Sequence, residues 1–211
     1  NQIWTIYPDG SIELQSSVNS NKPTTDLARL GYTMKLPKEY ADFTYYGRGP
    51  IDNFNDRKVG QNIEIFRQKV GDEIIHCRPQ SMGNHEEVRW AALTDAKGQG
   101  AAFIADGIMS ASALPWSEMG ITESAHPYQL PVSDGVYLHL DAKVTGLGGN
   151  SCGQGAPLVH DRAKAVIRNF GFIIRPLAST AALEKTVKVA ASGETPIIVK
   201  RDKEGITTLS S

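Results

Sequence analysis

The fold class is decided by one stretch near the start of the chain, Ile3-Trp4-Thr5-Ile6-Tyr7-Pro8-Asp9-Gly10-Ser11-Ile12-Glu13-Leu14-Gln15-Ser16-Ser17-Val18. Its two halves, 3–7 and 11–18, flank the turn residues 8–10, which is the pattern of a β-hairpin. In the second half Ile12, Leu14 and Val18 alternate with polar residues, so they share one face of a strand. The stretch therefore predicts two antiparallel strands that bury one face.

The same alternation returns in short segments along the rest of the chain. At 29–36 every second position is apolar, and further segments have strand composition: Phe43–Tyr46, Ile63–Val70, Glu87–Leu93, Ala101–Ala105, Ile108–Leu114, Val136–Leu140 and Val166–Ile174. The 20 glycines and 11 prolines fall mostly between these segments, where turns need them. Ser117–Ala125 predicts one short helix with an N-cap serine. Strands without long intervening helices predict an all-β fold, an antiparallel sandwich or barrel.

The length of 211 residues predicts one domain, with or without an appendage. The small residues 178–182 differ in character from the strands before them and indicate a linker. We therefore predict a main module over residues 1–177 and, over 178–211, the linker with a C-terminal β extension. In the extension Lys185–Val189 and Ile197–Lys200 are expected strands, and Gly205 is expected in a turn.

The charge balance excludes some functions. The chain has 22 Lys and Arg against 23 Asp and Glu, a net charge of −1. It therefore lacks the basic excess of a nucleic-acid or membrane-surface binder. It has no apolar run of membrane-spanning length and no signal peptide at its start, so the sequence does not indicate a compartment. Because the first residue is not Met, we expect a mature product or a piece cut from a longer protein. Cys77 and Cys152 allow at most one disulfide.

No catalytic constellation is predicted from the residues alone. The glycine-rich stretch at 146–151 lacks the third glycine of a dinucleotide fingerprint, so no cofactor is expected. In His85-Glu86-Glu87 a second zinc ligand would have to stand at position 89, which is Arg89, so no metal site is expected. His76 and Cys77 are adjacent and would point to opposite faces of a strand. The 23 acidic residues single out no glycosidase pair.

Three stretches carry a family resemblance. Motif 1 is Tyr46-Gly47-Arg48-Gly49-Pro50-Ile51-Asp52-Asn53-Phe54-Asn55-Asp56-Arg57, and motif 2 is Pro79-Gln80-Ser81-Met82-Gly83-Asn84-His85-Glu86-Glu87-Val88-Arg89-Trp90. Motif 3 is Gly146-Leu147-Gly148-Gly149-Asn150-Ser151-Cys152-Gly153, which Ala125-His126 and Leu130 precede. In order and spacing they resemble the signatures of the C-terminal small-chain domain, domain 5, of large β-galactosidases of glycoside hydrolase family 2. The resemblance spans roughly residues 1–177.

The resemblance implies a fold and a role. The family's domain is a large antiparallel β-sandwich of the galactose mutarotase-like type, and this chain is similar to it without the N-terminal side. In the family both catalytic glutamates lie on a preceding TIM barrel, and this domain walls one side of the galactoside cleft. The expected partners are that barrel domain and the galactoside substrate, and the chain alone is expected to be inactive. Cut strand edges also predict either a homodimer or a tolerated open edge. The parent enzyme would be cytoplasmic or periplasmic.

The resemblance also selects site residues. Cys152 stands where some relatives have a tryptophan that faces the sugar, and Ser81-Met82 replaces a Glu-Asn pair. The candidates for contact with substrate are Asn150, Ser151, Cys152 and His126. The other motif residues are interpreted as structural: Tyr46, Gly47, Gly49, Pro50, Asn53, Asp56, Arg57, Pro79, Gln80, Gly83, Arg89, Trp90, Gly148, Gly149 and Gly153. In particular, Gly47, Gly49 and Pro50 are expected to reverse the chain after the strand Phe43–Tyr46.

Two alternative functions stay open. A free-standing carbohydrate-binding sandwich would present exposed aromatic rings, for which Trp4, Trp116 and Tyr128 are the candidates. An aldose epimerase on the same fold would need a histidine and a glutamate that face each other on the sheet. For that pair the candidates are His126 or His139 with Glu87.

Overall fold

The computed structural model of the chain describes residues 1–72, 75–148, 155–188, 197–202 and 205–210. It is an all-β antiparallel sandwich. Its strands are β1 (Gln2–Ile6), β2 (Ile12–Asn19), β3 (Asp26–Leu27), β4 (Arg29–Leu36), β5 (Asp42–Gly49), β6 (Asn62–Lys69), β7 (His85–Thr94), β8 (Gly100–Leu114), β9 (Val136–Val144), β10 (Ala163–Lys164), β11 (Val166–Leu177), β12 (Ile197–Asp202) and β13 (Gly205–Ser210). The helices are α1 (Glu118–Glu123) and α2 (Leu183–Thr186), with short 3₁₀ turns at Pro127–Gln129, Val159–Asp161 and Thr180–Ala182. In the described parts of the chain no helix is long and apolar enough to cross a membrane.

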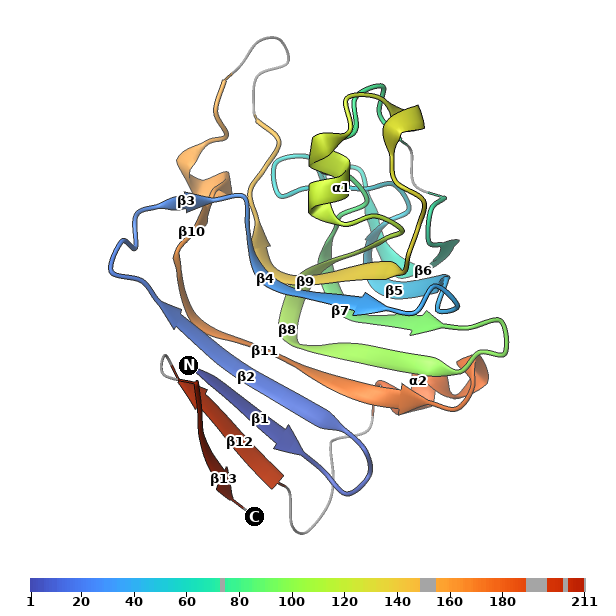
Figure 1. Cartoon of the computed structure of the whole chain (residues 1–211), viewed down its shortest axis with the longest axis vertical. Coiled ribbons are helices and arrows are strands. Elements are labelled where there is room, and N and C mark those ends of the chain that lie inside the picture. The colour runs from blue at the N-terminus through green and yellow to red at the C-terminus, as the bar shows by residue number, and fades with distance from the viewer. Residues whose placement is uncertain (73–74, 149–154, 189–196, 203–204, 211) are drawn as a thin grey trace.

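One sheet folds over itself to make both layers. Its strand order is β13-β12-β1-β2-β11-β8-β7-β5-β6, while β9 pairs with β8 and β4 pairs with β9. The first part of β8 pairs with β11 and its last part pairs with β9. Between them Gly107 has φ +95°, a conformation that glycine adopts without strain, and the strand bends there. The two strands predicted at 101–105 and 108–114 are therefore one long strand, which carries β9 and β4 over the other layer (Figure 1).

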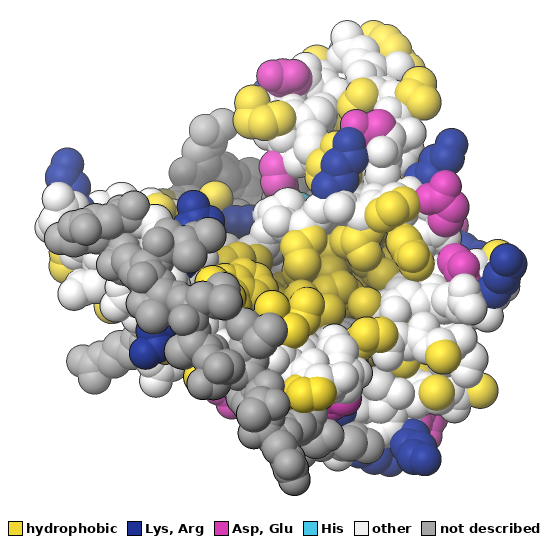
Figure 2. Space-filling model, turned by 60° about the horizontal axis from the view of Figure 1, so that its bottom comes forward, with side chains coloured by type: hydrophobic (Ala, Val, Ile, Leu, Met, Phe, Trp, Pro, Cys, Tyr) yellow, Lys and Arg dark blue, Asp and Glu magenta, His cyan; other side chains and the backbone are white. Residues whose placement is uncertain are grey.

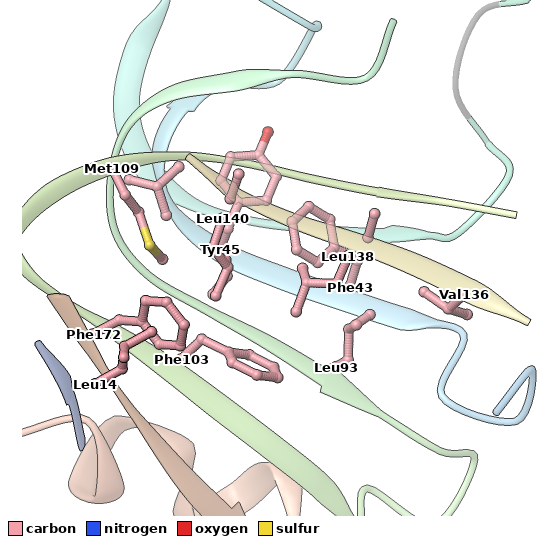
Figure 3. Close-up of a cluster of buried hydrophobic side chains, with 14 of the residues drawn as sticks. Leu14, Phe43, Tyr45, Leu93, Phe103, Met109, Val136, Leu138, Leu140 and Phe172 are labelled. Carbon is pink, nitrogen blue, oxygen red and sulfur yellow. The ribbon is translucent and has the colours of Figure 1, made fainter. Parts of the chain in front are cut away.

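The core lies between these layers and follows from the alternation in the sequence. Figure 3 shows Leu14 of β2, Phe43 of β5, Phe103 of β8 and Leu138 of β9 converging on one cluster. All of these side chains are buried, and each such burial contributes about 1.5–3 kcal/mol. The predicted hairpin is confirmed, because β1 and β2 pair across the turn at 8–10. The predicted helix is also confirmed as α1, with Ser117 as its N-cap.

Within the part of the chain that the structure describes, β4 pairs on one side only, with β9, so the sandwich is open along this strand. Trp4, Met34 and Leu36 pack against the core there and stay partly buried. On the face shown in Figure 2, hydrophobic side chains gather in the middle, and charged side chains lie around them. The layers are tied at this opening by Tyr32, whose ring lies 5.7 Å from that of Phe172.

The C-terminal segment continues the main sheet. Strand β12 pairs with β1, which confirms a strand at Ile197–Lys200, and Gly205 begins β13 with φ +119°. The strand predicted at Lys185–Val189 is wrong, because residues 183–186 form α2; Val189 lies outside the described residues. Helical spacing places Leu183 and Val187 on one face, and both pack against the cluster of Trp90 on the outer side of the sheet.

Candidate functional site

The described parts of the three motifs meet at one end of the sandwich. We call this the motif end; it comprises the loops 50–61, 75–84 and 115–135 and the described segments 145–148 and 155–162, which lie at the top of Figure 1. Motifs 1 and 2 are joined through Asn53, which is fully buried. Its amide Nδ2 donates to the carbonyls of Arg48 and Ile51 at 3.0 Å, and its Oδ1 accepts from the backbone N–H of Glu86 at 2.8 Å. Asn84 Nδ2 donates in return to the Asn53 carbonyl at 2.8 Å.

The glycines of motif 1 serve close packing. The prediction that Gly47 and Gly49 reverse the chain is wrong, since both lie inside β5 and the chain leaves the strand only at Pro50. A Cβ on Gly47 would lie 2.7 Å from Val88 Cγ2, and one on Gly49 would lie 2.4 Å from the Tyr45 hydroxyl. Neither position has room for a side chain, so these glycines let neighbouring strands and rings approach.

Hydrogen bonds from motif 1 also fix the start of motif 3. The carboxylate of Asp56 accepts from the backbone N–H groups of Leu147 at 3.1 Å and Gly148 at 2.8 Å. A Cβ on Gly146 would lie 2.4 Å from the Asp56 carboxyl, so only glycine allows this approach. Asn55 Nδ2 donates to Asp161 Oδ1 at 2.6 Å, and Gly146 N–H donates to the Asp161 carbonyl at 2.9 Å. The loop that leads to residues 149–153 is therefore clamped at its start.

A charged cluster is centred on a bulge of β7. Glu87 has φ +55°, and the register of β7 against β8 shifts on both sides of Val88. Its carboxylate lies 2.9 Å from Arg48 Nε and 3.0 Å from Lys58 Nζ. The bond from Arg48, more than any other contact, lowers the pKa of Glu87 from its ordinary value. Bulges of this kind re-aim a side chain, and here the bulge turns Glu87 towards motif 1.

A buried strip of polar side chains runs across the sheet under α1. We call it the polar strip; its members are the buried Glu86, Ser110, Ser112, His139 and Asp141 with the partly buried Arg29, and Glu118 of α1 lies over them. Glu86 Oε1 accepts from Ser110 Oγ at 2.9 Å and from Asn84 Nδ2 at 3.0 Å. Burial raises the pKa of Glu86, although these two bonds oppose the shift. Burial likewise raises the pKa of Asp141 to about 7 and lowers that of His139 to about 3.

Sequence reasoning missed the polar strip, although a signal was present. His139 and Asp141 alternate along β9 with the buried Leu138 and Leu140. Ser110 and Ser112 alternate in the same way in β8. A strand in which apolar and polar residues alternate and are all buried must be covered on both faces. Here the core covers the apolar face and α1 covers the polar face.

The predicted substrate contacts are only partly within the structure. Asn150, Ser151 and Cys152 lie outside the described residues, as do Gly149 and Gly153. His126 is exposed, and its ring stacks on that of Tyr128 at 5.3 Å.

The replacement of Glu-Asn by Ser81-Met82 has a structural counterpart. Met82 is 1% exposed and packs with Leu114 and with Ile121 of α1. A long apolar side chain at this position therefore seats the helix that covers the polar strip.

The remaining motif residues surround the same contacts. Arg57 pairs with Asp52 at 2.9 Å, and the Gly83 N–H points to the other oxygen of Asp52 at 3.4 Å. The guanidinium of Arg89 lies 5.7 Å from the centre of the Tyr46 ring, and Trp90 is 7% exposed in the outer cluster. Pro79 is buried and Gln80 is exposed.

The residues of the two alternative functions are placed as follows. Of the three aromatic candidates Tyr128 presents an open ring at 81% exposure, whereas Trp4 and Trp116 are partly buried in clusters. His139 is 2% exposed and contacts Thr33 and Glu118. In the described part of the chain no hydrogen bond or ion pair joins Glu87 to His126 or His139.

Comparison with known proteins identifies the family. A sequence profile described as beta galactosidase small chain matches residues 1–174. The chain belongs to this family. Relatives of this small-chain domain include the beta-galactosidase of Priestia megaterium, 31% identical over 154 residues, which are 72% of this chain and 15% of that protein. That of Lactobacillus delbrueckii subsp. bulgaricus is 36% identical over 157 residues, 72% of this chain and 15% of the relative. That of Kluyveromyces lactis is 29% identical over 173 residues, 81% and 16% of the respective lengths. The small-chain domain thus spans 15–16% of the length of these relatives.

Proposed function

We propose that this small-chain domain forms part of the wall of the sugar-binding cleft of a glycoside hydrolase family 2 β-galactosidase. The catalytic glutamates would lie on a TIM-barrel domain outside these 211 residues. The reaction of the parent enzyme would be retaining hydrolysis of terminal β-D-galactosides, in which two carboxylates flank the scissile bond. The sandwich would then be of the galactose mutarotase-like type, and its motif end would face the barrel.

The observation that carries the proposal is the apolar character of the motif end. Many of the exposed large hydrophobic side chains stand on its loops: Ile51, Val59, Ile75, Met119, Tyr128, Val132, Leu147, Leu158 and Val159. Val59 and Val132 are almost wholly exposed, at 102% and 94%. Loops that expose apolar side chains beside buried, well-bonded motifs are typical of a surface that another domain covers. This is the surface we assign to the barrel.

The clamp on motif 3 supports a role in substrate binding. Asp56 fixes Leu147 and Gly148 through their backbone, and Asn150 and Ser151 follow within a few residues. Their side chains offer the donors and acceptors that sugar hydroxyls need. A backbone that is held in place at Leu147 and Gly148 lowers the entropy cost of holding a ligand beside it, which is what the wall of a cleft contributes to catalysis.

The test is a chimera in which this chain replaces the matching segment of a full-length relative. We expect the chimera to hydrolyse a chromogenic β-galactoside and the isolated chain to be inactive. A Val59→Asp, Val132→Asp double variant should lower the activity of the chimera, whereas Ile65→Asp, at an exposed strand position outside the motif end, should not. Turnover by the isolated chain that is lost in Glu86→Gln would overturn the proposal.

Two further assays separate the alternative functions. Calorimetry with galactose would reveal a free-standing carbohydrate-binding module, and a mutarotation assay would reveal an epimerase. We expect neither signal from the isolated chain. The homodimer through an open edge stays a prediction, and size-exclusion chromatography at several concentrations tests it.

A further inference from the structure

The α1 arm, which we define as residues 115–135, is held on the sheet by apolar and polar contacts. Its apolar anchor is Ile121, which packs on Met82 and Leu114 together with Trp116 and Leu130 of the arm. At the end of the arm Asp134 pairs with Lys35 of β4 at 2.5 Å. The polar anchor of α1 itself is Glu118, whose Oε1 lies 3.1 Å from Arg29 Nη1 and 3.7 Å from His139 Nε2. Figure 1 shows α1 on the side of β4 and β9 that faces away from the core.

Strand register places the polar strip under this arm. Asp141 lies opposite Ser110 of β8 and Gly31 of β4, and His139 lies opposite Ser112 and Thr33. A Cβ on Gly31 would lie 2.4 Å from Asp141 Oδ1. The carboxyl group of Asp141 therefore rests on the bare backbone of β4, beside the guanidinium of Arg29.

A single cation serves two carboxylates in this arrangement. Arg29 Nη1 is 3.1 Å from Glu118 Oε1 on the arm and 3.6 Å from Asp141 Oδ2 on the sheet. Arg29 Nη1, Asp141 Oδ2 and His139 Nε2 are all buried, and none has a hydrogen-bond partner among the described residues. The charged and titratable groups that face Asp141 are Arg29 of β4, Glu118 of α1, Glu86 of β7 and His139 on its own strand; β8 presents only Ser110 and Ser112.

We infer that the α1 arm is a pH-dependent flap, seated by the Arg29–Glu118 pair while Asp141 is neutral and loosened when Asp141 ionises. An ionised Asp141 competes with Glu118 for the same guanidinium and repels the Glu118 carboxylate. Because the pair is mostly shielded from solvent on the Arg29 side, this competition is screened less than at an open surface. The apolar cluster around Ile121 and the Lys35–Asp134 pair keep the arm attached, so the expected change is local loosening around Glu118.

The buried state of Asp141 sets where the flap responds. Burial raises its pKa to about 7, Arg29 opposes this shift, and Glu118 and Glu86 add to it. The pKa of His139 is about 3, so this ring stays neutral across the same range and cannot replace the guanidinium as a cation. The seated arm is therefore expected below neutral pH, and the loosened arm above it.

The consequence for the parent enzyme rests on the proposed function, but the flap itself does not. The arm carries Met119, Tyr128 and Val132 of the apolar surface that we assign to the barrel. If the arm is loosened, these side chains would be held less firmly in place. Measurements on the isolated chain test the flap without any catalytic domain, so a failure of one proposal is distinguishable from a failure of the other.

The test is amide hydrogen exchange of peptides that cover the arm, at about pH 5.5 and about pH 8.5, corrected for the intrinsic rate at each pH. In the wild type we expect corrected exchange to rise about fivefold with a midpoint near pH 7. Asp141→Asn should give slow exchange at both pH values. Glu118→Gln should give fast exchange at both, because the pair is lost. These opposite flat profiles separate the flap from general destabilisation.

Glu123→Gln is the matched control, because Glu123 is an exposed residue at the end of the same helix. This variant should keep the wild-type step. A wild type without a step, or a step that persists in Asp141→Asn, would overturn the inference. If Asp141→Asn fails to fold, the Glu118→Gln variant replaces it in the test. A step in exchange that persists in Glu118→Gln would also overturn the inference.

Discussion

Asp56 shows how much one carboxylate can organise in this domain, since it accepts two backbone N–H groups of motif 3. We expect Asp56→Ala to lower the free energy of unfolding by about 2 kcal/mol, because hydrogen bonds to a charged group contribute about 1.5–3 kcal/mol each and this site is partly exposed. Urea unfolding measures the loss, and amide exchange at Leu147 and Gly148 locates it. Asp56→Asn keeps one acceptor oxygen and should lose about half as much. Equal losses in the two variants would contradict this account.

At Glu87 the effect of the backbone conformation on stability can be measured separately from the effect of the charge. Both Glu87→Gly and Glu87→Ala remove the pairs with Arg48 and Lys58, but glycine adopts φ +55° without the strain that alanine meets. Glu87→Gly should therefore be more stable than Glu87→Ala by about 1 kcal/mol in urea unfolding. The opposite order would show that the positive φ is not retained in solution.

Some of these residues could be selected from the sequence, and others could not. Asp56, Asn53 and Arg57 lie in motif 1, and the resemblance selected them as structural residues. The polar strip did not follow from the sequence, because its members come from positions near 29, 86, 110 and 140 and meet only through strand pairing. The positive φ of Glu87 had no local signal either, since glutamate is uncommon in that conformation.

At the scale of elements, the alternation of apolar and polar residues located most strands, but it did not show where two segments form one continuous strand. The break at Gly107 suggested two strands, while pairing to both β11 and β9 keeps β8 in one piece. The segment at 183–188 has too few apolar residues to distinguish a strand from a helix. The helix is favoured because it lets Leu183 pack on the outer face of the sheet, and this tertiary contact has no signal in the local sequence.

The contact of β5 with β7 gives a prediction for an element. At Gly47 a Cβ would meet Val88 Cγ2 at 2.7 Å and Val88 Cα at 2.9 Å, and the backbone atom cannot rotate away. We expect Gly47→Ala to lower the free energy of unfolding by about 2–3 kcal/mol through overpacking. Gly60→Ala is the control, because nothing lies within 4 Å of its Cβ position and only its φ of +88° opposes the change. Thermal unfolding compares them, and a smaller loss at Gly47 than at Gly60 would refute the packing argument.

For the whole molecule, buried groups make stability depend on pH in opposite directions. Burial lowers the pKa of His85 to about 4 and of His139 to about 3, so their contribution is lost as pH falls from about 6.5 towards those values. Burial raises the pKa of Asp141 to about 7, so its contribution is present below about 3.8 and lost as pH rises to 7. Between about pH 4 and 6.5 the two trends oppose each other.

Asp141→Asn removes one of these trends. Its free energy of unfolding should rise with pH between about 4 and 6.5, by about 2–3 kcal/mol more than that of the wild type. Urea unfolding at several pH values in that range measures the slopes. Glu123→Gln should follow the wild-type curve. Parallel curves for Asp141→Asn and the wild type would show that Asp141 titrates normally in the folded protein.

The pairing of β1 with β12 has a consequence for biosynthesis. Ile6 lies opposite Ile197, so β1 meets that neighbour only after about 190 further residues have been translated. At about 5–20 residues per second this delay is roughly 10–40 s. During that time the edge of β1 that pairs with β12 stays open, which makes the nascent hairpin a substrate for chaperones and a place where aggregation can start.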